Sequence, residues 1–204
     1  MTYLASVILV VISPGPDNIL AISRGLSQGR LAGALSSIGA GIGIMCHTVA
    51  AALGLALLLQ TSPMAFWVVK AVGAAYLIWL GYKAITARNL VSFLPTQQQS
   101  LLSVFMTGLL SNVLNPKPGL FVVAFIPQFT NPSRGSVPVQ MLVYGAIFAV
   151  LTAVVFAILS SFSVQLSKGL SRRPRVVAGV NIGAGVTFIA AGFSILALGQ
   201  RHGT

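Results

Sequence analysis

The sequence of 204 residues contains few charged side chains, and only one of them is acidic. Charged residues make up 6% of the chain, whereas a typical soluble domain has about 25%. This scarcity excludes a soluble globular protein. Because Asp17 is the single acidic side chain, hydrolysis by a pair of carboxylic acids is excluded as well.

Cysteine and histidine are almost as rare. The chain has one cysteine, Cys46, and two histidines, His47 and His202. A single cysteine forms no intrachain disulfide, and these three side chains do not compose a usual metal site. No serine nucleophile motif accompanies His47 and Asp17. We therefore expect no enzyme activity, no cofactor and no bound metal.

Apolar residues, by contrast, make up 56% of the chain, an amount that six membrane-spanning helices of about 20 residues would use. Six long apolar runs lie at about 3–23, 31–59, 65–85, 101–129, 137–165 and 176–198. They predict an all-α integral membrane protein with a single transmembrane domain over residues 1–204. The first run has neither a basic leader nor a small-residue cleavage site, so we expect it in the mature protein.

The basic residues lie mainly between these runs. They give a net charge of +11 but do not gather on one face with interleaved aromatic residues, so we expect lipid as a partner and not nucleic acid. Alternating connections divide them into two sets. The larger set is Arg24, Arg30, Lys83, Arg88, Lys168, Arg172, Arg173 and Arg175, and the smaller is Lys70, Arg134 and Arg201. The positive-inside rule makes the side of the larger set cytoplasmic and places both termini outside.

Two Pro-x-Pro breaks interrupt the first and fourth runs. Pro14 and Pro16 precede Pro116 and Pro118 by 102 residues each, half the chain length. Such a pair removes two backbone donors and forces extended geometry on the residues before it, so neither run can be one continuous helix. The spacing predicts two three-helix repeats, at about 1–88 and 101–200. They must be inverted relative to each other, because each contains an odd number of spans.

The paired breaks favour a substrate site near the middle of the membrane. Unsatisfied backbone groups cost several kcal/mol each in lipid, so two matching breaks indicate a buried, wet cavity more than kinks that only shape the bundle. Asp17 follows the first break and can bind a substrate ammonium group, carry a proton or cap the next helix. Lys117 lies inside the second break. It can bind a carboxylate, form a structural ion pair with Asp17, or alternate between the two.

Further candidate residues lie in the breaks and in two other runs. They are Pro14, Gly15, Pro16, Asn115 and Pro116 at the breaks, and His47 and Asn181 elsewhere. The two asparagines are polar enough to line a pathway or to form hydrogen bonds between helices. His47 can relay protons, because histidine changes charge near neutral pH, or it can be a hydrogen-bonded packing residue.

Five segments carry a resemblance that covers essentially the whole chain. They are residues 13–17 (SPGPD), 39–47, 75–83 (AYLIWLGYK), 115–117 (NPK) and 125–129 (FIPQF). Together they resemble the LysE/RhtB superfamily of amino-acid exporters. The family's Pro-Gly-Pro-Asp and Asn-Pro-Lys signatures correspond to Pro14 to Asp17 and to Asn115 to Lys117. The family commonly has a small apolar residue where this chain has Pro118, which makes the second break stiffer.

The resemblance implies a bacterial inner-membrane efflux protein driven by the proton motive force. Its substrates would be zwitterionic, neutral or basic amino acids, such as homoserine, threonine, leucine or lysine. Together with the inverted repeats, it predicts transport by alternating access. The alternative is a channel, or an exporter of another small ion or metabolite, with the same inverted build. A homodimer is a further option that the sequence leaves open, as it does a re-entrant first run with five spans and a cytoplasmic N-terminus.

The charge distribution generates a prediction about topology. We expect reporter enzymes that are active only outside the cytoplasm to work when fused to either terminus, because the larger basic set is retained inside. A fusion at Arg88, in a connection that carries part of the larger set, should be inactive and serves as the control. An inactive reporter at the N-terminus alone would indicate the re-entrant alternative.

Overall fold

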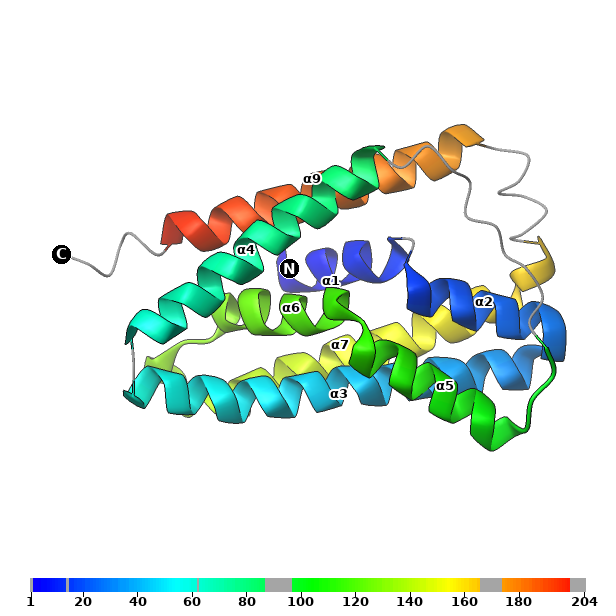
Figure 1. Ribbon diagram of the computed structural model, residues 1–204, viewed down its shortest axis with the longest axis horizontal. Coiled ribbons are helices and arrows are strands. Elements are labelled where there is room, and N and C mark those ends of the chain that lie inside the picture. The colour runs from blue at the N-terminus through cyan, green and yellow to red at the C-terminus, as the bar shows by residue number, and fades with distance from the viewer. Residues whose placement is uncertain (1, 14, 62, 87–96, 166–173, 199–204) are drawn as a thin grey trace.

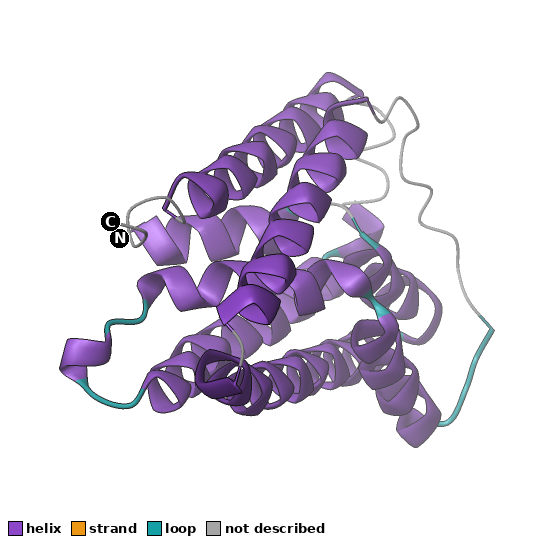
Figure 2. Cartoon of the chain, turned by 60° about the vertical axis from the view of Figure 1, so that its left-hand side comes forward, coloured by secondary structure: helices purple, strands orange, loops and turns teal. Residues whose placement is uncertain are grey.

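The computed structural model describes residues 2–13, 15–61, 63–86, 97–165 and 174–198. These residues form α-helices, two short 3-10 helices and their connections. In chain order they are α1 (Thr2–Ile12), α2 (Pro16–Gln28), α3 (Arg30–Thr61), α4 (Pro63–Thr86), α5 (Leu101–Leu114), α6 (Pro116–Phe125), η1 (Ile126–Phe129), η2 (Pro132–Arg134), α7 (Val137–Ser161) and α9 (Pro174–Leu198). Figure 2 shows helices and no strand in this part of the chain, which confirms the all-α expectation.

Long apolar helices account for the membrane-spanning character. Arg30–Gly54 of α3 and Val137–Ser161, which is α7, are each long and apolar enough to cross a membrane. Two bent pairs pass the same test when each pair is taken as one broken span, with bends of 57° between α1 and α2 and 53° between α5 and the segment that begins with α6. By length and composition, the described residues therefore contain two to four spans. The arrangement as six spans in two inverted repeats stays a prediction.

The helices are arranged so that the two broken segments lie in the middle. α3 lies along α7 and α5, and α4 lies along α9 on the opposite side of the molecule (Figure 1). Between these groups, α6 contacts both α3 and α4, whereas α1 contacts α7 and α9. Phe121 of α6 and Phe148 of α7 are almost fully buried here and pack edge to face. Ser13, Asp17 and Asn115, at or beside the two helix breaks, are thereby buried among the long helices.

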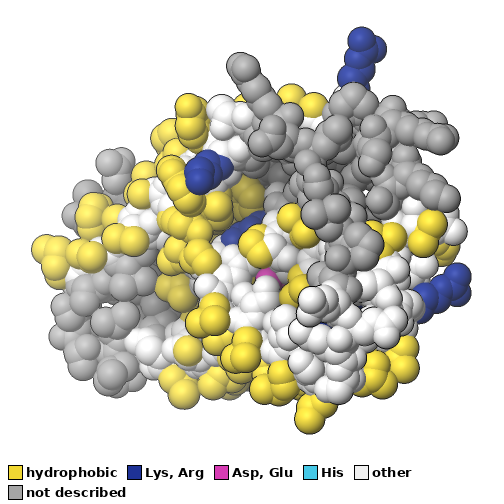
Figure 3. All heavy atoms as spheres, turned by 45° about the vertical axis from the view of Figure 1, so that its right-hand side comes forward, with side chains coloured by type: hydrophobic (Ala, Val, Ile, Leu, Met, Phe, Trp, Pro, Cys, Tyr) yellow, Lys and Arg dark blue, Asp and Glu magenta, His cyan; other side chains and the backbone are white. Residues whose placement is uncertain are grey.

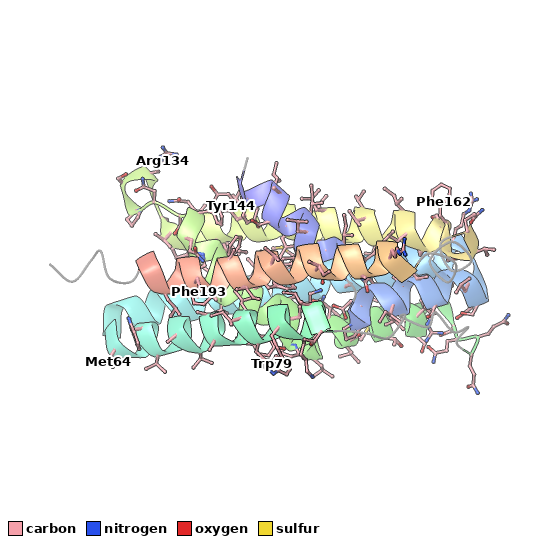
Figure 4. The ribbon with its side chains drawn as sticks, turned by 90° about the horizontal axis from the view of Figure 1, so that it is seen from above. Met64, Trp79, Arg134, Tyr144, Phe162 and Phe193 are labelled. Carbon is pink, nitrogen blue, oxygen red and sulfur yellow. The ribbon has the colours of Figure 1, made fainter. Side chains whose placement is uncertain are left out.

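The described ends and connections of the long helices lie at two ends of the molecule. The α2–α3 connection, the start of α5 and the end of α7, marked by Phe162, lie at one end (Figures 1 and 4). Met64 at the start of α4 and Arg134 lie at the other end (Figure 4). Among the described basic residues, Arg30 is the first residue of α3 and Arg175 the second residue of α9, and both helices start at the first end. Of the two sets of basic residues that the sequence separates, the described residues Arg30 and Arg175 of the larger set and Arg134 of the smaller set therefore lie at opposite ends.

Arg24 is an exception to its predicted place in a connection. The first apolar run was expected to end near residue 23, but α2 continues to Gln28, and Arg24 is only 3% exposed. Its guanidinium donates to Gln28 Oε1 at 3.1 Å, to the Gln97 carbonyl at 2.9 Å and to Gln99 Oε1 at 2.7 Å. These bonds pair the two terminal nitrogens of the guanidinium inside the fold and fasten the segment before α5 to α2.

Close crossings of the central helices depend on glycine. A Cβ atom at Gly108 of α5 would collide with the Ser36 carbonyl group of α3, and one at Gly39 of α3 would collide with the Phe105 carbonyl of α5. The two helices therefore approach backbone to backbone at reciprocal glycines. This is the small-residue packing that membrane helices use when no hydrophobic force drives them together.

This crossing generates a prediction about stability. We expect Gly108→Ala to lower the stability of the detergent-solubilised protein by about 1–3 kcal/mol, because the added methyl group meets backbone atoms that cannot turn away. Gly54→Ala is the matched control, since a Cβ there meets nothing within 4 Å, and alanine in an open helix is favoured by up to about 1 kcal/mol. Thermal unfolding measures both. Equal melting temperatures for the two variants would contradict the proposed close crossing.

Candidate functional site

At the first break, an asparagine side chain takes the place of helical backbone bonds. α1 ends at Ile12 and α2 begins at Pro16, and Pro14 lies outside the described residues. Asn18 Nδ2 donates to the Ser13 carbonyl at 2.9 Å, and the Gly15 amide donates to Asn18 Oδ1 at 2.8 Å. Pro16 occupies the first position of α2, where its missing N–H costs nothing. Asn18 therefore closes this turn and leaves the neighbouring Asp17 carboxylate for other contacts.

At the second break, Asn115 joins two helices. It follows the last residue of α5 and precedes Pro116, the first residue of α6. Its backbone N–H donates to the Asn112 carbonyl at 3.0 Å, and its side-chain oxygen accepts from the Lys117 amide at 3.0 Å. Such a side-chain acceptor satisfies one of the free amides at a helix start. The asparagine thus orients the first turn of α6, which carries Lys117.

Asp17 is bound by donors from the second break. The residue is 7% exposed. Its Oδ1 accepts from Ser111 Oγ at 2.9 Å, and its Oδ2 accepts from Asn112 Nδ2 at 2.7 Å and Asn115 Nδ2 at 3.0 Å. Hydrogen bonds to an ionised acceptor are roughly twice as strong as neutral ones. The buried carboxylate is therefore held by neutral donors, and it links α2 to the α5–α6 break.

Lys117 makes the reciprocal contact. Its Nζ donates to the Ser13 carbonyl at the first break at 3.0 Å and lies 5.5 Å from the centroid of the Phe188 ring of α9. A Cβ atom at Gly15 would come within 3.3 Å of Nζ, so the glycine leaves room for the ammonium group. In the described part of the chain, Lys117 and Asp17 do not form a direct ion pair. The structural ion pair considered from the sequence is absent in this conformation.

Both charged side chains line one small cavity between the breaks. We call it the central cavity, and its volume is about 30 Å³. Since a water molecule needs about 10–15 Å³ of such volume, the cavity has room for a few waters. A small part of the single acidic side chain is visible from outside (Figure 3). The lining residues are Val10, Val11, Ser13, Gly15, Asp17, Asn18, Ile44, Asn112, Asn115, Lys117, Pro118, Phe148, Thr152 and Phe156.

The other candidates from the sequence lie in different places. Gly15 and Asn115 line the central cavity, whereas Pro16 and Pro116 are exposed at the starts of their helices. His47 lies behind the cavity wall: its Nε2 is 3.1 Å from the Asn112 carbonyl oxygen, and its ring lies against Gly119. This geometry favours the packing role over a direct place in the cavity. The side chain of Asn181, in α9, lies outside the described residues, as Pro14 does.

Several polar residues of the site were not identified from the sequence. Ser111 and Asn112 bind Asp17, Asn18 closes the first break, and Thr152 lines the central cavity. A usable signal was present for one of them: Asn112 lies one helical turn before Asn115, within an apolar run. For Thr152 the sequence offers no such signal, because threonine is common in membrane helices.

Comparison with known proteins identifies the family. Residues 8–199 match the model of the LysE type translocator family. The chain belongs to this family. Family membership and the apolar helices agree with the expectation of a multi-pass membrane protein. Because members of the family are translocators, they also agree with the expectation that the chain is not an enzyme.

Some relatives of this translocator have names that state a substrate, and others do not. An uncharacterized membrane protein of Vibrio cholerae is 32% identical over 94% of this chain and 93% of its own. A homoserine/homoserine lactone efflux protein of Salmonella typhi is 30% identical over 98% of this chain and 96% of its own. A leucine efflux protein of Klebsiella pneumoniae is 33% identical over 63% of this chain and 62% of its own. No solved structure matches the chain.

Asn115 caps α6 and also donates to Asp17. Asn131, a second asparagine that caps a short helix before proline, allows the two contributions to be separated. Its side-chain oxygen accepts from the Ser133 amide at 2.9 Å, but the residue is exposed and has no hydrogen bond to Asp17. We expect Asn131→Ala to cost about 1 kcal/mol, as for an ordinary cap. Asn115→Ala should cost about 2–4 kcal/mol, because Asp17 also loses a charge-assisted donor. Unfolding of the two purified variants measures the difference; equal losses would contradict a stabilising Asn115–Asp17 contact.

Proposed function

We propose that this translocator exports zwitterionic amino acids by secondary active transport. The observation that carries the proposal is the pair of opposite charges on one buried cavity, Asp17 from the first helix break and Lys117 from the second, neither neutralised by the other. A zwitterion offers one charge of the matching sign to each. The efflux of homoserine and leucine by relatives, as their names state, supports an amino acid as the substrate class.

The existing contacts of the two charges suit such a ligand. The carboxylate of Asp17 holds neutral donors at 2.7–3.0 Å, and a substrate ammonium group can join them as a charged donor. The ammonium group of Lys117 is bound to a single backbone carbonyl, that of Ser13. A substrate carboxylate can replace this neutral acceptor with a charged one. Because the central cavity has room for only a few waters in this conformation, binding requires the surrounding helices to separate.

This requirement supports alternating access of two inverted repeats, at about 1–88 and 101–200. Asp17 in the first half is held by side chains of the second half, and Lys117 in the second half is held by Ser13 of the first. A substrate carboxylate that replaces the Ser13 carbonyl at Lys117 changes the free-energy difference between conformations in which the halves are joined and separated. The contact between Lys117 and Ser13 would then act as the lock that substrate binding releases.

Coupling to the proton motive force would fall to Asp17. It is the single acidic side chain of the chain, and a buried carboxylate in a membrane protein is a common proton carrier. When protonated, it would lose its attraction for an ammonium group. Proton binding from outside would then favour substrate release, which is the order that export requires.

Counterflow in proteoliposomes tests the transport of amino acids. We expect accumulation of labelled zwitterionic amino acids against unlabelled internal substrate, and no conductance in a planar bilayer. Absence of flux for every amino acid, by protein shown to be folded, would overturn the proposal, and a conductance would favour a channel instead.

Two variants assign the roles of the charges. We expect Asp17→Asn to lose uphill export under an imposed pH gradient, because the amide cannot carry the proton. We expect Lys117→Gln to weaken amino-acid binding about 10- to 100-fold while leaving carboxamide analogues unaffected, since a charged hydrogen bond of about 1.5–3 kcal/mol is lost. Lys83→Gln is the control, because Lys83 is exposed and lies over the Trp79 ring. Unchanged coupling in Asp17→Asn would remove Asp17 as the proton site.

A further inference from the structure

One hydroxyl group on the wall of the central cavity has no partner. Thr152 lies in α7 and is 2% exposed, and its Oγ1 is buried without a hydrogen bond. Buried side chains of Arg24 and Asn112 also carry one unpartnered atom each, but the rest of each polar group is bound. Among these three residues, only Thr152 makes no side-chain hydrogen bond. Buried polar groups are rarely left without a hydrogen-bond partner, and each such group needs an explanation.

Other helical hydroxyl groups form a hydrogen bond within their own helix that Thr152 does not form. Ser37, Thr48, Thr107 and Ser161 each donate to the carbonyl four residues earlier, at 2.7–2.8 Å. This bond back to the helix is how serine and threonine normally satisfy themselves in a membrane helix. Thr152 does not make it, so its hydroxyl is available to a group inside the cavity.

The surroundings of this hydroxyl are apolar. Phe148 and Phe156 lie one helical turn to either side on α7, and Val10 and Ile44 belong to the same cavity wall. The charged and amide groups of the cavity come instead from the two helix breaks. The cavity therefore has a polar side and an apolar side, with one hydroxyl group on the apolar side.

From this placement we infer that Thr152 is a specificity-determining residue that recognises a hydroxyl group on the side chain of the bound amino acid. The inference rests on the proposed function, in which Asp17 takes the ammonium group and Lys117 the carboxylate. The side chain of the substrate then faces the remaining wall. A small side chain with a hydroxyl group satisfies Thr152 and fills the apolar surroundings with its carbon atoms. An isosteric side chain without the hydroxyl group leaves Thr152 unpaired, which is the usual basis for rejecting such analogues.

Threonine and valine are the probes, because they have nearly the same shape and differ in the hydroxyl group. In counterflow with the reconstituted protein, we expect unlabelled threonine to compete about 10- to 100-fold better than valine. Thr152→Val should bring this ratio to about 1, whereas Thr152→Ser should retain most of it. Thr107→Val is the control, because Thr107 is bound to the Ser103 carbonyl and does not line the cavity. The ratio of threonine to valine competition in Thr107→Val should equal that of the natural protein.

The outcomes separate this inference from the proposed function. Equal competition by threonine and valine in the natural protein, or an unchanged ratio in Thr152→Val, would overturn the role of Thr152 while export of amino acids stands. Absence of transport of any amino acid would overturn both. Where Thr152→Val folds poorly, a melting-temperature shift of the natural protein that is equal for threonine and valine would be sufficient to reject the inference, because ligands stabilise in proportion to their affinity.

Discussion

The burial of a single carboxylate determines which polar groups must surround it at the centre of this protein. An ionised group without hydrogen bonds is very costly away from water, and Asp17 is nearly buried between helices. The donors that satisfy it, Ser111, Asn112 and Asn115, all belong to the end of α5 and the break that follows. The two breaks are therefore interdependent: the carboxylate needs the second break for its donors, and the amide groups of that break need the carboxylate as their acceptor.

The breaks also release backbone carbonyls, and the structure uses them as side-chain acceptors. The Ser13 carbonyl accepts from both Asn18 and Lys117. The Asn112 carbonyl accepts from the Asn115 amide and lies within 3.1 Å of His47 Nε2. A continuous helix would have consumed both carbonyls in its own ladder. Interrupting the helices thus converts these carbonyls into fixed acceptors that orient the Lys117 ammonium group, the Asn18 side chain and the Asn115 backbone around one cavity.

Local sequence patterns predict part of this arrangement. The apolar runs mark the helices to within a few residues, and the position of Asp17 and Lys117 beside prolines places both at interruptions. The hydrogen-bond partners of Asp17 and Lys117, however, do not follow from these patterns. Opposite charges at matched breaks suggest a direct ion pair, but neutral groups bind each of them, because the first turn of α6 and the α1–α2 bend determine where the side chains reach. Likewise, nothing in the sequence distinguishes Ser111 and Thr152 from other polar residues, because the packing of the helices determines which helix face lies toward Asp17 and the central cavity.

Neutral partners have an energetic consequence for the proposed transport cycle. Separating a buried ion pair to admit a substrate would leave two unpaired charges, at about 3–5 kcal/mol or more. A neutral hydrogen bond, such as that from Lys117 to the Ser13 carbonyl, contributes only about 0.5–1.5 kcal/mol net, somewhat more when the donor is charged. Asp17 need not lose its donors at all when an ammonium group joins them. A site built in this way can bind a zwitterion without first separating its own charges, and it can release the substrate again because both charged groups are already hydrogen-bonded in the empty state.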